Sequence, residues 1–268
     1  MLQKILEPFT GVWRHRVLVK QFTIRDVNLR YKGSFLGIVW SFITPILMLI
    51  VYTFVFSEIF EAKWDVGSDN KIEFALIVFC GLAVYNLFAE TMTRSPGLIL
   101  SNVNYVKKVV FPLEILPLSV MLSAFINLLI SFIVLFAGIL VFHEFHYTSL
   151  LFIVVLLPYI LFVAGLSWIF SALGVYLRDV GQVIVVVVQA LMLLSPIFYP
   201  VTAFPEDLQL LYHLNPIGIV IEEMRRVVIF GQLPNWNFVL GELVFSLLVY
   251  MIGYKCFKKA KKGFADVV

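Results

Sequence analysis

The residues best suited to chemistry stand out against an apolar background, and the first group lies in NYVKKVVFPLEILP, which begins at Asn104. This stretch is too apolar for an ordinary solvated loop, yet its lysines and prolines prevent it from being a membrane span. Lys107 and Lys108 suit the level of the lipid head groups, and Phe111-Pro112 breaks the chain before the next apolar run. The pattern predicts either a short helix along the membrane or a lysine-anchored turn that positions the following span.

A second group of charges, Glu222, Glu223, Arg225 and Arg226, interrupts the apolar stretch LYHLNPIGIVIEEMRRVVIFG. On one helical turn, an i, i+3 ion pair is available between Glu222 and Arg225 or between Glu223 and Arg226. The stretch is too short and too interrupted to cross a membrane twice. Residues 201–235 are therefore predicted to form a re-entrant helical hairpin, with an amphipathic surface helix as the alternative.

A third place is the short connection YLRDVGQV, where Arg178 and Asp179 stand side by side between long apolar runs. A local salt bridge or an anchor at the membrane interface is one explanation, and exposed ion pairs of this kind contribute only about 0 to 1 kcal/mol. A contact with a partner protein is the other explanation.

Motifs for catalysis and nucleotide binding are missing from the sequence. It contains no GxxxxGK loop followed by Ser or Thr, and no GxSxG nucleophile motif. The HEFH stretch from His143 to His146 lacks the HExxH spacing, so no metal site is predicted. Any ATP must therefore be handled by another chain, and we expect neither an enzyme nor a cofactor on this one.

The elements that carry these residues follow from the composition. Of 268 residues, 61% are apolar and only 14% are charged, whereas soluble domains average roughly 25% charged residues. Because a helix needs about 20 residues to cross the hydrocarbon core, the long uncharged runs predict an all-α, polytopic membrane protein. The six predicted spans are residues 35–60, 72–92, 113–142, 149–177, 182–200 and 236–257.

Three regions result from this division. Residues 1–34 mix aromatic and charged side chains and suit a helix lying in the membrane interface. Residues 35–257 form the transmembrane domain, and residues 258–268 form a basic tail. The second and sixth spans contain Glu90 and Glu242, which we expect to face a protein interior or lie near an interface, because a carboxylate in hydrocarbon is costly.

The distribution of Lys and Arg predicts the orientation. Segments on one side of the six spans carry seven, three, one and five of these residues, and the segments on the other side carry four in all. By the positive-inside rule, both termini are predicted to face the cytoplasm.

Five stretches in order, RYKGSFLGIVWSFITP, VKKVVFPLEILPLS, YLRDV, SPIFYP and LNP, resemble the membrane subunit of a type-2 ABC exporter over nearly the whole chain. Within that group they are most similar to permeases that export O-antigen polysaccharides and teichoic acids. The resemblance implies a half-transporter in the bacterial inner membrane. Two copies would form the pathway for a lipid-linked glycan, two copies of a separate ATPase subunit would bind ATP and Mg²⁺ beneath, and no nucleic acid is involved.

The resemblance also implies roles for the groups of residues described above. The loop between spans two and three becomes a coupling helix that rests in a groove of the ATPase, with Arg178 and Asp179 as a second, smaller contact. The charged outer turn becomes a gate that lines the exit and holds it closed at rest. The residues assigned to the coupling helix or its support are Asn104, Lys107, Lys108, Phe111 and Pro112, and those assigned to the gate are Glu222, Glu223, Arg225 and Arg226.

Aromatic side chains supply a candidate lining for a glycan pathway, because their rigid faces contact a sugar ring without a fixed hydrogen-bond pattern. Tyr52, Phe56 and Phe60 recur every four residues and share a helix face near the outer end of span one. Phe198 and Tyr199 end span five at a similar depth. A lipid-facing aromatic belt is the alternative, since the chain contains 26 Phe residues.

Three other functions compete with glycan export. A type-2 ABC permease for drugs or small lipids fits the same pattern, and a substrate assay separates the two. An ion-coupled secondary transporter favours ionisable residues near the bilayer midplane, whereas most charges here lie near the predicted span ends. A membrane enzyme acting on polyprenyl carriers needs clustered acidic residues, and the predicted cytoplasmic loops contain none.

Overall fold

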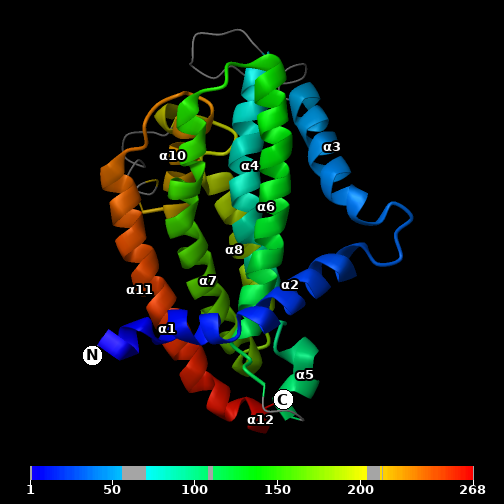
Figure 1. Cartoon of the computed structure of the whole chain (residues 1–268), viewed down its shortest axis with the longest axis vertical. Coiled ribbons are helices and arrows are strands. Elements are labelled where there is room, and N and C mark those ends of the chain that lie inside the picture. Colours follow the sequence, from blue (N-terminus) through cyan, green and yellow to red (C-terminus); the bar gives the residue numbers. More distant parts are fainter. Residues whose placement is uncertain (1, 56–70, 108–110, 204–211, 213, 268) are drawn as a thin grey trace.

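The structure is a computed structural model that describes residues 2–55, 71–107, 111–203, 212 and 214–267, and all regular elements within these ranges are helices (Figure 1). The all-α prediction is therefore confirmed. The α-helices are α1 (Leu2–Arg14), α2 (Arg16–Tyr31), α3 (Trp40–Phe54), α4 (Lys71–Arg94), α5 (Val103–Lys107), α6 (Ile115–Phe142), α7 (Phe152–Tyr176), α8 (Val180–Leu194), α10 (Pro216–Val228), α11 (Trp236–Ala260) and α12 (Phe264–Val267).

Five helical segments in the described ranges are long and apolar enough to cross a membrane. They correspond to the first four predicted spans and to the sixth, although residues 56–60 of the first lie outside the described residues. The chain is thus a multi-pass membrane protein by length and composition of its helices. The five segments are Gly37–Phe54, Ile72–Arg94, Ile115–Phe142, Tyr147–Tyr176 and Trp236–Val267.

The fifth predicted span, residues 182–200, is wrong at its outer boundary. Helix α8 ends at Leu194, and Ser195 has an extended backbone with ψ 147°. The cause is Pro196, because a proline disfavours helical backbone in the residue before it. The 15 residues of α8 extend about 22 Å, which is shorter than the hydrocarbon core of about 30 Å.

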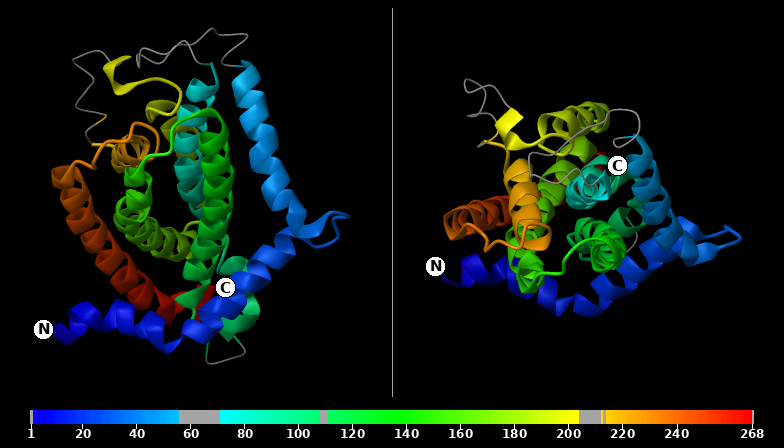
Figure 2. Two further views of the ribbon diagram at one scale, coloured as in Figure 1. Left: turned by 45° about the horizontal axis from the view of Figure 1, so that its top comes forward. Right: turned by 90° about the horizontal axis from the view of Figure 1, so that it is seen from above.

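Helix α4 is the centre of the bundle, with 83% of its most apolar window buried. Helices α3, α6, α7, α8 and α10 all pack against it. Helix α3 is different, because only 6% of its window is buried. Figure 2 shows α3 at the edge of the bundle, where it follows α2. Among the five candidate spans, α3 is therefore the one least enclosed by its own chain.

The most extensive contact between two helices joins α7 and α11. Gly165 and Gly253 let these helices meet backbone to backbone, since a Cβ on Gly165 would lie 2.7 Å from the backbone nitrogen of Tyr250. Small residues serve the same purpose in membrane helix packing generally. Beside this contact, the buried indole of Trp168 packs on Tyr250 and donates to the Glu114 carbonyl at 2.9 Å.

The two ends of the bundle differ in the elements that they carry. Helices α1, α2, α5 and α12 gather at one end, here called the basal end, together with both chain termini (Figure 1). Helix α10 and the short turn η4 (Tyr147–Leu151) pack together at the opposite, distal end. The N-terminal segment, predicted as one helix, consists of two helices that meet at His15.

Candidate functional site

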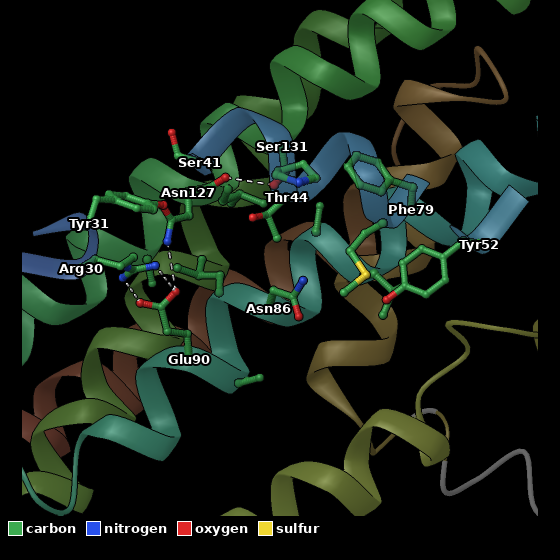
Figure 3. A pocket seen from close by; sticks show the side chains of 18 residues that line it. Arg30, Tyr31, Ser41, Thr44, Tyr52, Phe79, Asn86, Glu90, Asn127 and Ser131 are labelled. Carbon is green, nitrogen blue, oxygen red and sulfur yellow. Dashed lines mark hydrogen bonds and ion pairs between the residues drawn. The ribbon is translucent and has the colours of Figure 1, made fainter. Parts of the chain in front are cut away.

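A groove of about 490 Å³ lies between α3, α4 and α6, and both polar and apolar side chains line it. Arg30 and Glu90 close one end of it, and Tyr52 and Phe79 lie at the other end (Figure 3). Amide and hydroxyl groups line the wall between these two ends. These polar residues are Ser41 and Thr44 of α3, Asn86 of α4, and Asn127 and Ser131 of α6.

A hydrogen-bonded ion pair forms the charged end of the groove. Both Glu90 oxygens accept from the guanidinium of Arg30, and Asn127 Nδ2 donates to Glu90 Oε2 at 3.2 Å (Figure 3). The same guanidinium donates to Ser123 Oγ at 3.2 Å. Glu90 therefore faces α2 and α6, in line with the expectation that it faces a protein interior or lies near an interface.

A second ion pair extends this network toward the basal end. Arg94 contacts both oxygens of Asp26, at 2.9 and 2.5 Å, and reaches Glu90 Oε1 at 3.1 Å. Burial works to raise the pKa of Asp26, but hydrogen bonds and positive charge from Arg94 outweigh it and hold that pKa below its usual value. The carboxylate of Asp26 is therefore ionised at neutral pH and fastens α2 to the end of α4.

Sequence reasoning missed this network. Asp26 and Arg30 are one turn apart on α2, and Glu90 and Arg94 are one turn apart on α4. The matching i, i+4 spacing of opposite charges was a usable signal. It was hidden because residues 1–34 were read as a segment facing lipid and solvent rather than the transmembrane helices.

The predicted aromatic lining is only partly assembled. Tyr52 lines the groove, whereas Phe56 and Phe60 lie outside the described residues. Phe198 and Tyr199 follow the end of α8 instead of ending a span, because Pro196 has already broken that helix. The Tyr199 hydroxyl donates to the Leu193 carbonyl at 2.5 Å, and neither residue lines the groove.

The predicted coupling segment forms the short helix α5 and the chain that follows it at the basal end. Its inner side is an aromatic cluster in which the Phe22, Tyr105 and Phe111 rings have centroids 4.7 to 5.5 Å apart. Arg25 of α2 lies over the Phe22 ring at 4.2 Å and donates to the Tyr105 hydroxyl at 2.9 Å. The segment is therefore packed firmly on α2.

The other side of the segment is polar and open. Asn104 and Lys107 are exposed, Pro112 is half-buried, and Lys108 lies outside the described residues. Lys261, near the C-terminus, donates to the Phe111 carbonyl at 3.3 Å and to Glu114 Oε2 at 2.9 Å. The exposed side chains of Asn104 and Lys107 thus rest on a base formed by α2 and the C-terminal segment.

Arg178 and Asp179 are both exposed at the start of α8. Neither belongs to an ion pair within the described ranges, so the alternative of a local salt bridge is wrong. Their position is basal, because the preceding Tyr176 donates to the Ala260 carbonyl at 2.7 Å, close to α12. The structure thus leaves both charges available to a partner.

At the distal end, Arg225 of the predicted gate is fully buried. Its guanidinium donates to the Ile77, Pro196 and Ile197 carbonyls at 3.0, 2.5 and 2.6 Å. It also pairs with Glu222 at 3.0 Å, which confirms the first of the two predicted i, i+3 pairs. Arg225 therefore fastens α10 to α4 and to the chain after α8.

The alternative pair, between Glu223 and Arg226, does not form in the structure. Glu223 accepts the backbone N–H of Asn235 at 2.7 Å, and Arg226 donates to the Leu233 carbonyl at 2.9 Å. These bonds hold the chain that leads from α10 into α11. The other limb of the predicted hairpin falls largely on residues outside the described ranges.

The loop before α7 supports the end of α10. Thr148 and Ser149 donate to the Val227 and Val228 carbonyls at 2.9 and 3.2 Å. His143 Nε2 lies 3.1 Å from the Ile229 carbonyl. These contacts provide partners for backbone carbonyls at the helix end, which intrahelical bonding leaves open.

Comparison with known proteins identifies the family of this chain. The sequence pattern of the ABC-2 type transporter family matches residues 17–229, from the start of α2 to the end of α10. The chain belongs to the ABC-2 type transporter family. It is thus a transport subunit without catalytic activity of its own.

Individual relatives align over nearly the whole chain. The O-antigen export system permease protein RfbA of Klebsiella pneumoniae is 25% identical over 94% of this chain and 95% of the relative. The protein of the same name from Myxococcus xanthus is 24% identical over 96% and 97%. The polysialic acid transport protein KpsM of Escherichia coli is 22% identical over 95% and 97%.

Proposed function

We propose that this chain is the membrane subunit of an ABC transporter that exports a lipid-linked polysaccharide, of the O-antigen or teichoic-acid type, across the bacterial inner membrane. The observation that carries this proposal is the end-to-end similarity to three O-antigen export permeases and to polysialic acid transport proteins. Because the alignments cover 94% or more of the chain, the similarity extends beyond one shared motif.

ATP hydrolysis is assigned to a separate subunit that docks on the basal end. Two exposed groups support this assignment, since Asn104 and Lys107 lie on one segment and Arg178 and Asp179 on another. Charged side chains that have no partner among the described residues suit a contact with a soluble protein. In this arrangement the basal end and both termini are cytoplasmic, which agrees with the Lys and Arg distribution.

The transmembrane domain is assigned six spans, with α8 as the short fifth one. Helices α1 and α2 are assigned to the cytoplasmic membrane interface, and α10 to a re-entrant position at the outer side. The burial of Arg225 supports a position of α10 within the protein, because its guanidinium is shielded and bonded to carbonyl groups. Two copies of the chain are assigned to each transporter.

Deletion of the gene in its native cell tests the proposed function. We expect loss of the surface glycan and accumulation of a lipid-linked glycan on the cytoplasmic side, both reversed by the intact gene. The control strain carries the intact permease with an inactivated ATPase and should show the same phenotype. An unchanged surface glycan, with altered drug or small-lipid export, would instead support the alternative type-2 permease.

A further inference from the structure

We infer that the groove between α3, α4 and α6 is a saccharide-binding site within one protomer, in which the amide of Asn86 binds sugar hydroxyls. This inference rests on the proposed function and goes beyond it, because it assigns the side chains that hold the cargo. It also states which part of a lipid-linked glycan the groove takes, namely the sugar rather than the phosphate.

Asn86 is the residue that points most directly to a ligand. From Phe74 to Phe88, α4 is buried at each position except Asn86, which is exposed. Its amide makes no hydrogen bond with the residues that the structure describes. An amide facing hydrocarbon without a partner is costly. A ligand, water or a second copy of the chain would satisfy it, and Figure 3 shows the side chain in the groove between the charged and aromatic ends.

The other groups in the groove match the chemistry of a sugar. Thr44 is exposed on α3, and Tyr52 lies half-buried at the far end beside the buried Phe79 (Figure 3). On α6, Asn127 donates to Glu90 and Ser131 donates to the Asn127 carbonyl, so their side-chain oxygens remain as acceptors. Amides and hydroxyls both donate to and accept from sugar hydroxyls, and aromatic rings contact the apolar face of the ring. The volume of about 490 Å³ falls in the range of small-molecule sites.

The charges argue against a phosphate ligand. Arg30 and Glu90 are the charged residues that line the groove, and they are bound to each other. Arg94, the next cation, is paired with Asp26 and Glu90. To bind Arg30, a phosphate would have to displace the carboxylate of Glu90. The two negative groups would then lie close together and repel each other. A neutral, hydroxyl-rich group meets no such obstacle.

Binding to the complete transporter tests the inference. The probe is an oligosaccharide released by mild acid from the surface glycan of the native host, added to the permease and ATPase complex in lipid nanodiscs. Saturation-transfer NMR then reports contacts with sugar protons. We expect transfer with the wild type, and roughly three- to tenfold weaker binding with Asn86→Leu, as for the loss of one net hydrogen bond.

Two controls separate binding from folding. Asn86→Leu should leave the melting temperature and ATPase association unchanged, because Asn86 holds no other part of the described chain. Asn237→Leu removes an exposed amide from α11, outside the groove, and should bind like the wild type. Inorganic pyrophosphate at equal concentration should not displace the sugar.

Four outcomes would overturn the inference: no transfer with the wild type, unchanged binding with Asn86→Leu, displacement by pyrophosphate, or cross-linking of Asn86→Cys between two copies of the chain. The last would show that a second protomer occupies the groove. If any of these is found while gene deletion still abolishes the surface glycan, the binding site is refuted and the proposed function stands. If deletion leaves the glycan unchanged, the proposed function itself fails.

Discussion

Asn215 donates a hydrogen bond to Ser195 Oγ across 2.9 Å, which joins the LNP and SPIFYP stretches at the distal end. Asn215 Oδ1 also accepts the Ile217 and Gly218 N–H groups at 3.1 and 3.3 Å and so caps the start of α10. One side chain thus begins α10 and binds it to the end of α8. Two motifs that are separate in the sequence form one junction.

Replacement of Asn215 tests the stability of this junction. Asn215→Ala removes the helix cap and should lower the free energy of unfolding by about 1 to 2 kcal/mol. Asn215→Asp keeps the acceptor for the α10 N–H groups but loses the donor to Ser195, so it should be less destabilising. Thermal unfolding of the purified chain in detergent measures both, and equal melting temperatures for Asn215→Ala and the wild type would contradict the assignment.

Arg225 should be the most sensitive charged residue of α10. Arg225→Met leaves the carbonyls of Ile77, Pro196 and Ile197 without this donor and should cost roughly 3 to 5 kcal/mol. Arg226→Met is the matched control on the next position and removes one exposed bond to a backbone carbonyl, worth about 1 kcal/mol. Similar melting temperatures for the two variants would show that the bonds of Arg225 do not stabilise the packing of α10 against α4.

The Asp26–Arg94 pair should fasten α2 to α4. Because Arg94 is more than a third exposed, we expect a coupling energy of only about 1 kcal/mol in a double-mutant cycle of Asp26→Asn and Arg94→Gln. Hydrogen exchange of residues 16–31 should rise in either single variant. Exchange that stays at the wild-type level in both would mean that α2 is held by apolar packing alone.

The pH dependence of this contact follows from the lowered pKa of Asp26. A carboxyl with a lower pKa in the folded state stabilises that state above its unfolded pKa, and the contribution is lost as the pH falls through the folded value. Protection of residues 16–31 should therefore be constant near neutral pH and fall below about pH 4. The Asp26→Asn variant should not show this loss of protection in acid. If its protection depends on pH in the same way as that of the wild type, Asp26 is not the source of the loss.

The coupling segment should bind the ATPase through its exposed side. Lys107→Glu changes a charge that supports no described contact, so it should weaken copurification of the ATPase several-fold without altering the melting temperature. Phe111→Asp should lower both the copurification of the ATPase and the melting temperature, since Phe111 packs in the aromatic cluster with Phe22 and Tyr105.

Gln232→Glu is the control for Lys107→Glu, because it adds a negative charge at an exposed distal position. Copurification and export should remain at wild-type levels in this variant. If Lys107→Glu also leaves both unchanged, the segment serves only as a turn before α6.

Much of the fold could be predicted because apolar length alone defines most membrane helices. Helix α6 begins and ends within two residues of the predicted span, since no charge interrupts it and its one proline, Pro117, lies in the first turn, where the missing N–H breaks no intrahelical bond. The error in α8 has a local cause in Pro196, whose effect on Ser195 outweighs the apolar residues that follow. A long apolar run is thus a necessary sign of a span but does not fix where its helix stops.

The partners of individual charges were harder to predict. The Glu222–Arg225 pair lies on one helical turn and was accessible from spacing, whereas the bonds of Arg225 to Ile77 and Ile197 depend on the packing of distant segments. The same holds for Arg30 and Glu90, which are 60 residues apart in the sequence. Matching charge spacing shows that two helix faces could pair, but it does not establish which helices become neighbours.

Transport in a purified system tests the proposed function most directly. The permease and its ATPase would be reconstituted in liposomes together with the lipid-linked glycan that accumulates in the deletion strain, and glycan accessible to a lectin on the opposite side would be measured over time. We predict ATP-dependent transfer of the glycan, and none with the ATPase alone or with a hydrolysis-deficient ATPase. Transfer that is independent of ATP, or its absence from an assembled complex that hydrolyses ATP, would contradict the assignment of this chain to polysaccharide export.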